Sequence, residues 1–280
     1  MRATVVLIFL TSQMLHAQTL TVQQVVSKML TELDTEIQPG SVDTLKSGNW
    51  DQEVTGIATT FLATLSVLKK AQAQGINLIL THEPTFYNHL DNKMEFGEDD
   101  PVVKAKEAFI KEHNLVVFRF HDVPHQVEDD MIKKGMLKEL GWEKRNLGNM
   151  VIDSPFSTVG ELANFLQEHF NTSTVRVVGD PDQTIEKFGF LPGAYGRHMQ
   201  VKNYNIQEID ALIIGEGAEW EIVEYARDAQ ELGWKRALIV MGHAHSEEGG
   251  MEYVAEWLKR LLPEVPVAFI PAGNPLWSPE

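Results

Sequence analysis

The chain has 280 residues, which is enough for one large domain or two modest ones with a sizeable hydrophobic core. Its 24 basic and 40 acidic residues give a net charge of −16, which repels phosphate backbones and predicts no nucleic-acid partner. No cysteine is present, so zinc-thiolate modules, disulfide scaffolds and cysteine nucleophiles are excluded.

Residues 1–17 have the pattern of a signal peptide. Met1 and Arg2 give a positive start, residues 5–10 form a short apolar core, and Ala17 offers a small residue at a cleavage point. The alternative is a buried N-terminal strand. The apolar stretch is well short of the ~20 residues that a membrane-spanning helix needs, so no membrane span is predicted. We expect export, to the periplasm or the medium, after cleavage.

The first half of the mature chain predicts alternating strands and helices. Apolar residues recur at spacings of three and four along one helical face: Val22, Val25, Val26, Met29, Leu30, Leu33 and Ile37. A strand at 54–59, a helix at 61–74, a strand at 76–80, a helix at 101–113 and a strand at 115–120 then follow. Two consecutive strand–helix–strand crossovers predict a mostly parallel sheet.

The second half repeats this alternation. Thr158 and Glu161 predict a capping box at the start of a helix, which a strand at 175–178 follows. Further strands are expected at 185–191, 209–214 and 236–241, with a helix at about 219–232. A last helix has one apolar face made of Met251, Val254, Ala255, Leu258, Leu261 and Leu262. Residues 147–157 are the predicted crossover, which divides the chain into an N-terminal lobe, 18–147, and a C-terminal lobe, 148–280.

Histidines and carboxylates cluster where three of these apolar strands end. Five of the ten histidines lie in these clusters: His82, His121, His125, His243 and His245. In an open α/β sheet, ligands bind outside the carboxyl ends of the strands. Imidazole and carboxylate together suit zinc, manganese or iron, so the clusters predict a site for two divalent ions. A single strand-end histidine such as His82 could instead be a hydrogen-bonded loop residue.

Glu247 is placed to bridge two ions if the chain turns as a helix after His243, because residues four apart share a helical face. Gly249 and Gly250 permit that turn. Alternatively, Glu247 and Glu248 interact as a first-turn pair with the helix dipole. Glu216, at the end of another strand, is a candidate carboxylate that supports a metal ligand from outside or faces the substrate, or it is an ordinary loop acid.

The segments VTGI, NLILTHEP, VRVVGD, IDALIIGEG, GHAHSEEGGMEYVAEWLK and VPVAFIPAGNP resemble the NIF-three-like family, also called GTP cyclohydrolase type-two-like dinuclear metal proteins. The resemblance implies two α/β lobes with mostly parallel or mixed sheets, helices on the outer faces and a metal site between the lobes. It also implies toroidal hexamers built from dimers, two divalent ions and a link to GTP ring opening.

The family's ligand positions fall on His82 and Glu83, on His121 and His125, and on His243 and Glu247. Two positions depart from the family pattern: Glu83 stands where a histidine is expected and His125 where an aspartate is expected. This exchange keeps one imidazole and one carboxylate in the set, so the number of ligands is unchanged. Asp122 could replace the aspartate instead of His125, and both alternatives stay open.

We therefore expect an exported metal-dependent hydrolase that uses metal-bound water on a small, nucleotide-like or phosphorylated substrate. His121 and Glu216 are the candidates for proton transfer. The metal ligands are expected to be His82, Glu83, Asp122 or His125, His243 and Glu247. A non-enzymatic metal-binding or scaffold protein is the alternative. A metallophosphoesterase is a third, since GHAH resembles that group's closing motif, although its D-x-H and G-N-H-E motifs are missing.

Overall fold

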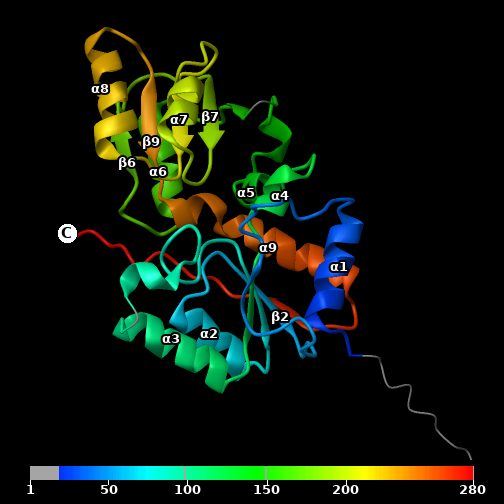
Figure 1. The fold of residues 1–280 in the computed structure, drawn as a ribbon. Coiled ribbons are helices and arrows are strands. Elements are labelled where there is room, and N and C mark those ends of the chain that lie inside the picture. The colour runs from blue at the N-terminus through cyan, green and yellow to red at the C-terminus, as the bar shows by residue number, and fades with distance from the viewer. Residues whose placement is uncertain (1–18, 98, 149, 280) are drawn as a thin grey trace, which may run out of the picture.

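The structure, a computed structural model, describes residues 19–97, 99–148 and 150–279. The predicted signal peptide, 1–17, lies outside the described residues. Two lobes each contain a five-stranded sheet covered by helices on both faces, and helix α9 (His243–Leu261) lies between the lobes (Figure 1). This confirms the predicted fold class, two α/β lobes with mixed sheets. No helix in the described ranges combines the length and apolar character needed to cross a bilayer.

The first sheet has the strand order β1-β4-β3-β2-β10. Strands β2, β3, β4 and β10 are parallel, and β1 pairs antiparallel with β4. The elements of this lobe are α1 (Val22–Glu32), β1 (Leu45–Ser47), β2 (Ile57–Thr60), α2 (Leu65–Ala73), β3 (Leu78–Thr81), α3 (Pro101–Glu112), β4 (Val116–Arg119), α4 (Asp122–Gln126), α5 (Met131–Glu139) and β10 (Val267–Phe269).

Both faces of the first sheet are buried, which explains its continuous apolar strands. Along β3, Leu78 and Leu80 pack with residues of α1 and α9. The intervening Ile79 packs on the opposite face with residues of α2 and α3. Since successive side chains point to opposite faces, a fully apolar strand needs helices on both sides.

The second sheet has the order β5-β7-β8-β9-β6, with β7, β8 and β9 parallel and the outer strands antiparallel. Residues of α5 and α6 cover one face, and residues of α7 and α8 cover the other. Its elements are β5 (Val151–Asp153), α6 (Val159–His169), β6 (Arg176–Val178), β7 (Lys187–Leu191), α7 (Arg197–Tyr204), β8 (Ala211–Ile214), the π-helical turn η3 (Glu219–Val223), α8 (Glu224–Glu231) and β9 (Ala237–Val240).

Helix α9 connects the two lobes. It begins directly after β9 of the second sheet, packs against β2 and α5, and leads into β10, which pairs with β2 of the first sheet. Glycines permit the close approach to α5: a Cβ added to Gly135 would lie 2.6 Å from the Gly249 carbonyl oxygen. The division at residue 147 stays a prediction, and the return of β10 to the first sheet is a feature that the sequence did not indicate.

Most of the long elements lie where the periodicity predicted them, but helix α5 and several shorter elements of three to eight residues were not predicted. Strands β1, β5 and β10 are too short to show a period of two.

The predicted capping box at the start of α6 is only half formed. The Thr158 hydroxyl accepts from the Glu161 N–H at 3.2 Å, but the Glu161 carboxylate accepts from the Ser157 N–H at 2.7 Å.

Candidate metal centre

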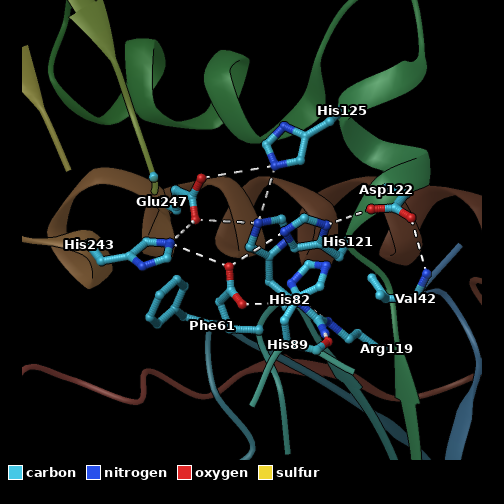
Figure 2. Close-up of polar contacts among 12 residues, drawn as sticks. Val42, Phe61, His82, His89, Arg119, His121, Asp122, His125, His243 and Glu247 are labelled. Atoms are coloured by element: carbon cyan, nitrogen blue, oxygen red, sulfur yellow. Dashed lines mark hydrogen bonds and ion pairs between the residues drawn. The ribbon is translucent and has the colours of Figure 1, made fainter. Parts of the chain in front are cut away.

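The three predicted clusters converge between the lobes. His82 and Glu83 follow β3 directly, while His121 lies at the N-terminus of α4, which also carries His125. His243 begins α9 after β9 of the other sheet. Figure 2 shows the imidazoles of His82, His125 and His243 around the Glu247 carboxylate, with the imidazole of His121 beside that of His82.

Glu247 is the carboxylate that brings three of these imidazoles together. Its Oε2 lies 2.9 Å from His243 Nε2 and 3.4 Å from His82 Nε2, and its Oε1 lies 3.9 Å from His125 Nε2. Only 3.3 Å separates the Nε2 atoms of His82 and His125. His243 and Glu247 are one helical turn apart on α9, which is the turn the bridging prediction required.

Glu83 supplies a second carboxylate on the opposite side. Its Oε1 lies 3.3 Å from His243 Nε2 and 3.5 Å from His121 Nε2. Its Oε2 accepts a hydrogen bond from the guanidinium of Arg119 at 3.1 Å. Arg119 is fully buried and also donates to the carbonyl of His82. The arginine therefore holds one oxygen of Glu83 and leaves the other for the imidazoles.

Each of the four imidazoles turns Nε2 inward and binds an outer acceptor through Nδ1. The acceptors are the Phe120 carbonyl for His82 at 3.3 Å, Asp122 for His121 at 2.8 Å, Asp130 for His125 at 3.0 Å and Glu216 for His243 at 3.4 Å. Such partners fix the tautomer with the proton on Nδ1, which leaves the Nε2 lone pair for a metal.

The structure distinguishes Asp122 from His125, the alternatives left open by the sequence. The Asp122 carboxylate accepts from the Ser41 hydroxyl at 2.7 Å and from the Val42 N–H at 3.1 Å, on the far side of His121 (Figure 2). His125 instead points its Nε2 into the group. Glu216 contacts only the outer nitrogen of His243 within the cluster, and its side chain is 61% exposed.

The remaining predicted residues lie outside the group. His245 Nε2 accepts a hydrogen bond from the side-chain amide of Asn274 at 3.0 Å, and its ring lies beside that of Phe170. Glu248 accepts hydrogen bonds from the backbone N–H groups of Ala272 and Gly273. Neither residue faces the four inward Nε2 atoms.

The charges in the group balance one another. Burial disfavours the ionised carboxylates, but hydrogen bonds from His121 and His243 hold the pKa of Glu83 far below its usual range. The pKa of Glu247 is lowered in the same way by His82 and His243. Burial would lower the pKa of His243, yet Glu216, Glu247 and Glu83 together raise it to about 12. Without a cation, imidazolium charge offsets the carboxylates, and a divalent ion would displace these protons.

The residues fit a divalent cation. The ligand atoms of His82, His121 and His125 lie within 4.8 Å of one another, as do those of His82, Glu83 and Glu247. Ligands at about 2.1 Å from a tetrahedral zinc ion would be roughly 3.4 Å apart. The observed separations of 2.9–3.5 Å in most pairs match this spacing. Nitrogen and carboxylate donors without sulfur suit zinc, manganese or iron.

Loop residues hold the ligand-bearing helices in place. The buried Asp43 accepts hydrogen bonds from the backbone N–H groups of His121, Asp122 and Val123, and so fixes the first turn of α4. At the start of α9, the Ser246 hydroxyl donates to the His243 carbonyl at 2.7 Å and accepts from the Gly193 N–H at 2.8 Å.

Sequence reasoning missed Arg119, Asp130 and Asp43. Arg119 left a visible signal, because it interrupts the apolar strand LVVFRF at a buried position. Asp43 and Asp130 left none, since loop acids are common and nothing local indicates what they contact.

A cavity of about 1360 Å³ opens over the group. His121, His125, His243 and Glu247 form part of its wall. Other parts of the wall come from both lobes and from the C-terminal segment: Phe61, Tyr87, His89, Lys106, Thr174, Arg176, Tyr195 and Trp277. This volume exceeds what two ions and their water need, and it is above the roughly 300–1,000 Å³ of ordinary small-molecule sites, so it leaves room for an organic molecule beside the ligands.

Comparison with known proteins gives consistent results. The family model described as Duf34/NIF3 (NGG1p interacting factor 3) matches residues 41–275. A GTP cyclohydrolase 1 type 2 homolog from Clostridium acetobutylicum is 24% identical over 216 residues, covering 72% of this chain and 76% of that protein. A protein of the same name from Clostridium perfringens is 22% identical over 233 residues, covering 78% and 83%.

Solved structures share the fold. The Staphylococcus aureus hypothetical protein SA1388 superposes with a TM-score of 0.71 at 15% identity, covering 94% of this chain and 100% of that one. A Bacillus cereus protein related to NIF3 gives a TM-score of 0.72 at 13% identity, with the same coverage.

Proposed function

The chain belongs to the Duf34/NIF3 family, and from that premise we propose that it is a metal-dependent hydrolase that acts on a small molecule between its lobes. The observation that supports this most strongly is the shared orientation of four imidazoles. Each turns Nε2 toward the same space and ties Nδ1 to an outer acceptor. Histidines that serve only packing have no reason to share that arrangement.

We assign six ligands for two divalent ions. His82, His125 and Glu247 form one set by their mutual distances. His121 and His243 form the other with Glu83, whose Oε1 lies within 3.5 Å of the Nε2 atom of each. Glu247 Oε2 also lies 2.9 Å from His243 Nε2, so this carboxylate joins the two sets. Divalent ions bound there would supply Lewis acidity and lower the pKa of coordinated water.

The other polar residues orient the ligands or handle protons. Asp122 and Asp130 hold the outer nitrogens of His121 and His125. His121 was a candidate for proton transfer, but its Nε2 lies among the ligand atoms, so we assign it to metal binding. Glu216 is exposed toward the cavity and lies beside His243 Nδ1, so its carboxylate is the group placed to accept a proton from a substrate.

Elemental analysis of the protein purified without added metal tests the metal assignment. We expect about two ions per chain. His243→Asn and Glu247→Gln should each lose bound metal, whereas Glu252→Gln, an exposed residue of the same helix, should retain the wild-type content. A metal-free wild-type protein, or full metal content in both site variants, would contradict the assignment.

Turnover assays then test the hydrolase. The mature protein should hydrolyse at least one member of a panel of phosphoesters, GTP and cyclic amides, and the double variant His243→Asn/Glu247→Gln should be inactive. Activity that survives in the double variant would eliminate a metal-dependent reaction at this site. Full metal content without turnover would favour a metal-binding or scaffold protein.

We also propose that the protein is exported, since residues 1–17 combine a positive start, an apolar core and a small residue at the exit. N-terminal sequencing of protein recovered outside the cytoplasm should begin at Gln18. Recovery of the intact N-terminus in the cytoplasm would refute export.

A further inference from the structure

Helix α3 carries a lysine on its buried face. The buried residues of this helix are Val103, Lys106 and Ile110, which recur at spacings of three and four and face the core. Lys106 therefore occupies a position where the helical pattern calls for an apolar side chain. It is only 4% exposed. Residues that break a local rule in this way are expected mainly at functional sites.

The ammonium group of Lys106 is incompletely paired. It donates to the Thr85 carbonyl at 2.5 Å and lies 4.9 Å from the centre of the Tyr87 ring. Among the described residues, no carboxylate oxygen lies within 4.0 Å of it, and its other two N–H groups have no hydrogen-bond acceptor. Asp91, the charge that acts on it from further away, is already paired with Lys46 at 3.3 Å.

Arg119 shows by contrast how a buried cation is satisfied in this lobe. Its guanidinium donates to the carbonyls of His82 and His89 and to the carboxylate of Glu83. Lys106 has no such carboxylate, and burial lowers its pKa to about 8. A buried cation without a counter-charge destabilises the fold, so stability does not explain why the lysine is there.

Lys106 also lines the cavity over the metal centre. The wall between them includes Tyr87 and His89, and the ring of His89 lies 6.1 Å from that of His121. A single organic molecule could therefore contact the metal centre at one end and the lysine at the other.

We propose that Lys106 anchors an anionic group, a phosphate or a carboxylate, of the molecule whose reacting bond lies at the metal centre. The inference rests on the proposed function and narrows its substrate class to anions. An ammonium group with two free N–H donors in a site of low dielectric forms strong charge-assisted hydrogen bonds to an anionic oxygen. The anion would supply the counter-charge that the fold lacks.

Calorimetric titration at pH 7 with inorganic phosphate, and separately with acetate, tests this. Wild type, Lys106→Met and Lys93→Met are each titrated as purified and after treatment with EDTA. Lys93 is a matched control. The ammonium groups of Lys93 and Lys106 both lie beside the Phe86 ring, at 4.6 and 5.8 Å from its centre, but Lys93 is paired with Glu107 and does not line the cavity. We expect wild type and Lys93→Met to bind one of the anions in both preparations, and Lys106→Met to bind it about tenfold more weakly or worse.

The two probes separate the two sources of charge: binding of phosphate alone indicates a phosphorylated substrate, and binding of acetate alone a carboxylate. Lys106→Met should melt no lower than wild type and should retain the wild-type metal content. Equal anion binding by wild type and Lys106→Met, no binding by EDTA-treated wild type, or a Lys106→Met variant that fails to fold would overturn the inference. Metal analysis of the same samples shows separately whether the proposed metal centre exists.

Discussion

Raising the pH should stabilise the wild-type protein relative to Lys106→Met. Burial lowers the pKa of Lys106 in the folded protein to about 8, against 10.5 in an exposed lysine. Between these values the unfolded chain binds a proton at this residue that the folded chain has lost, so the free energy of unfolding rises with pH. At about 1.36 kcal/mol per pKa unit, the difference between the two pKa values corresponds to about 3 kcal/mol in the free energy of unfolding.

Urea unfolding of both proteins, at intervals from about pH 7 to about pH 10.5, measures this difference directly. Methionine does not titrate, so subtracting its curve removes the contributions of all other groups that the two proteins share. The wild-type protein should be the less stable of the two below pH 8, and the deficit should shrink as the pH approaches 10.5. A difference between the two proteins that stays constant over this range would refute the reasoning.

Three further predictions concern the metal centre and the contact between α5 and α9. EDTA should lower the melting temperature, because an ion present at about 1,000 times its dissociation constant contributes about 4 kcal/mol; an unchanged melting temperature would contradict a bound ion. Asp130→Asn should weaken metal affinity about 10- to 100-fold in a chelator competition, whereas the exposed Asp129→Asn should not. Gly250→Ala should destabilise the protein by about 1–3 kcal/mol in urea unfolding, because the added Cβ would lie 2.6 Å from the Ile132 Cα, while Gly196→Ala, with open space around it, should be nearly neutral.

Long periodic segments were predictable because their signal is local. The apolar stripe that begins at Val22 gives α1, and the buried runs give β3, β4 and β9 close to where they were expected. Strands of three residues, such as β1 and β10, form only because a neighbouring strand offers hydrogen-bond partners. Their own residues carry too little information to indicate them.

The candidate site also has a part that the sequence indicated and a part that needed the structure. Strand ends rich in histidine and carboxylate pointed to His82, His125, His243 and Glu247, because parallel strands deliver their carboxyl ends to one edge of a sheet. The choice between Asp122 and His125 depended on how the first turn of α4 is held by Asp43, far away in the sequence. No spacing rule reports such a contact.

Composition, periodicity and the residues at strand ends were thus sufficient to predict an α/β fold and a set of candidate metal ligands, since each depends on neighbours along the chain. Only the tertiary structure brought the end of β9 in one lobe against the ends of β3 and β4 in the other, through α9 and the return of β10. It alone showed that Arg119 is neutralised while Lys106 is not. The physical reason is that the charge environment of a buried group is set by residues distant in sequence, which only packing brings into contact.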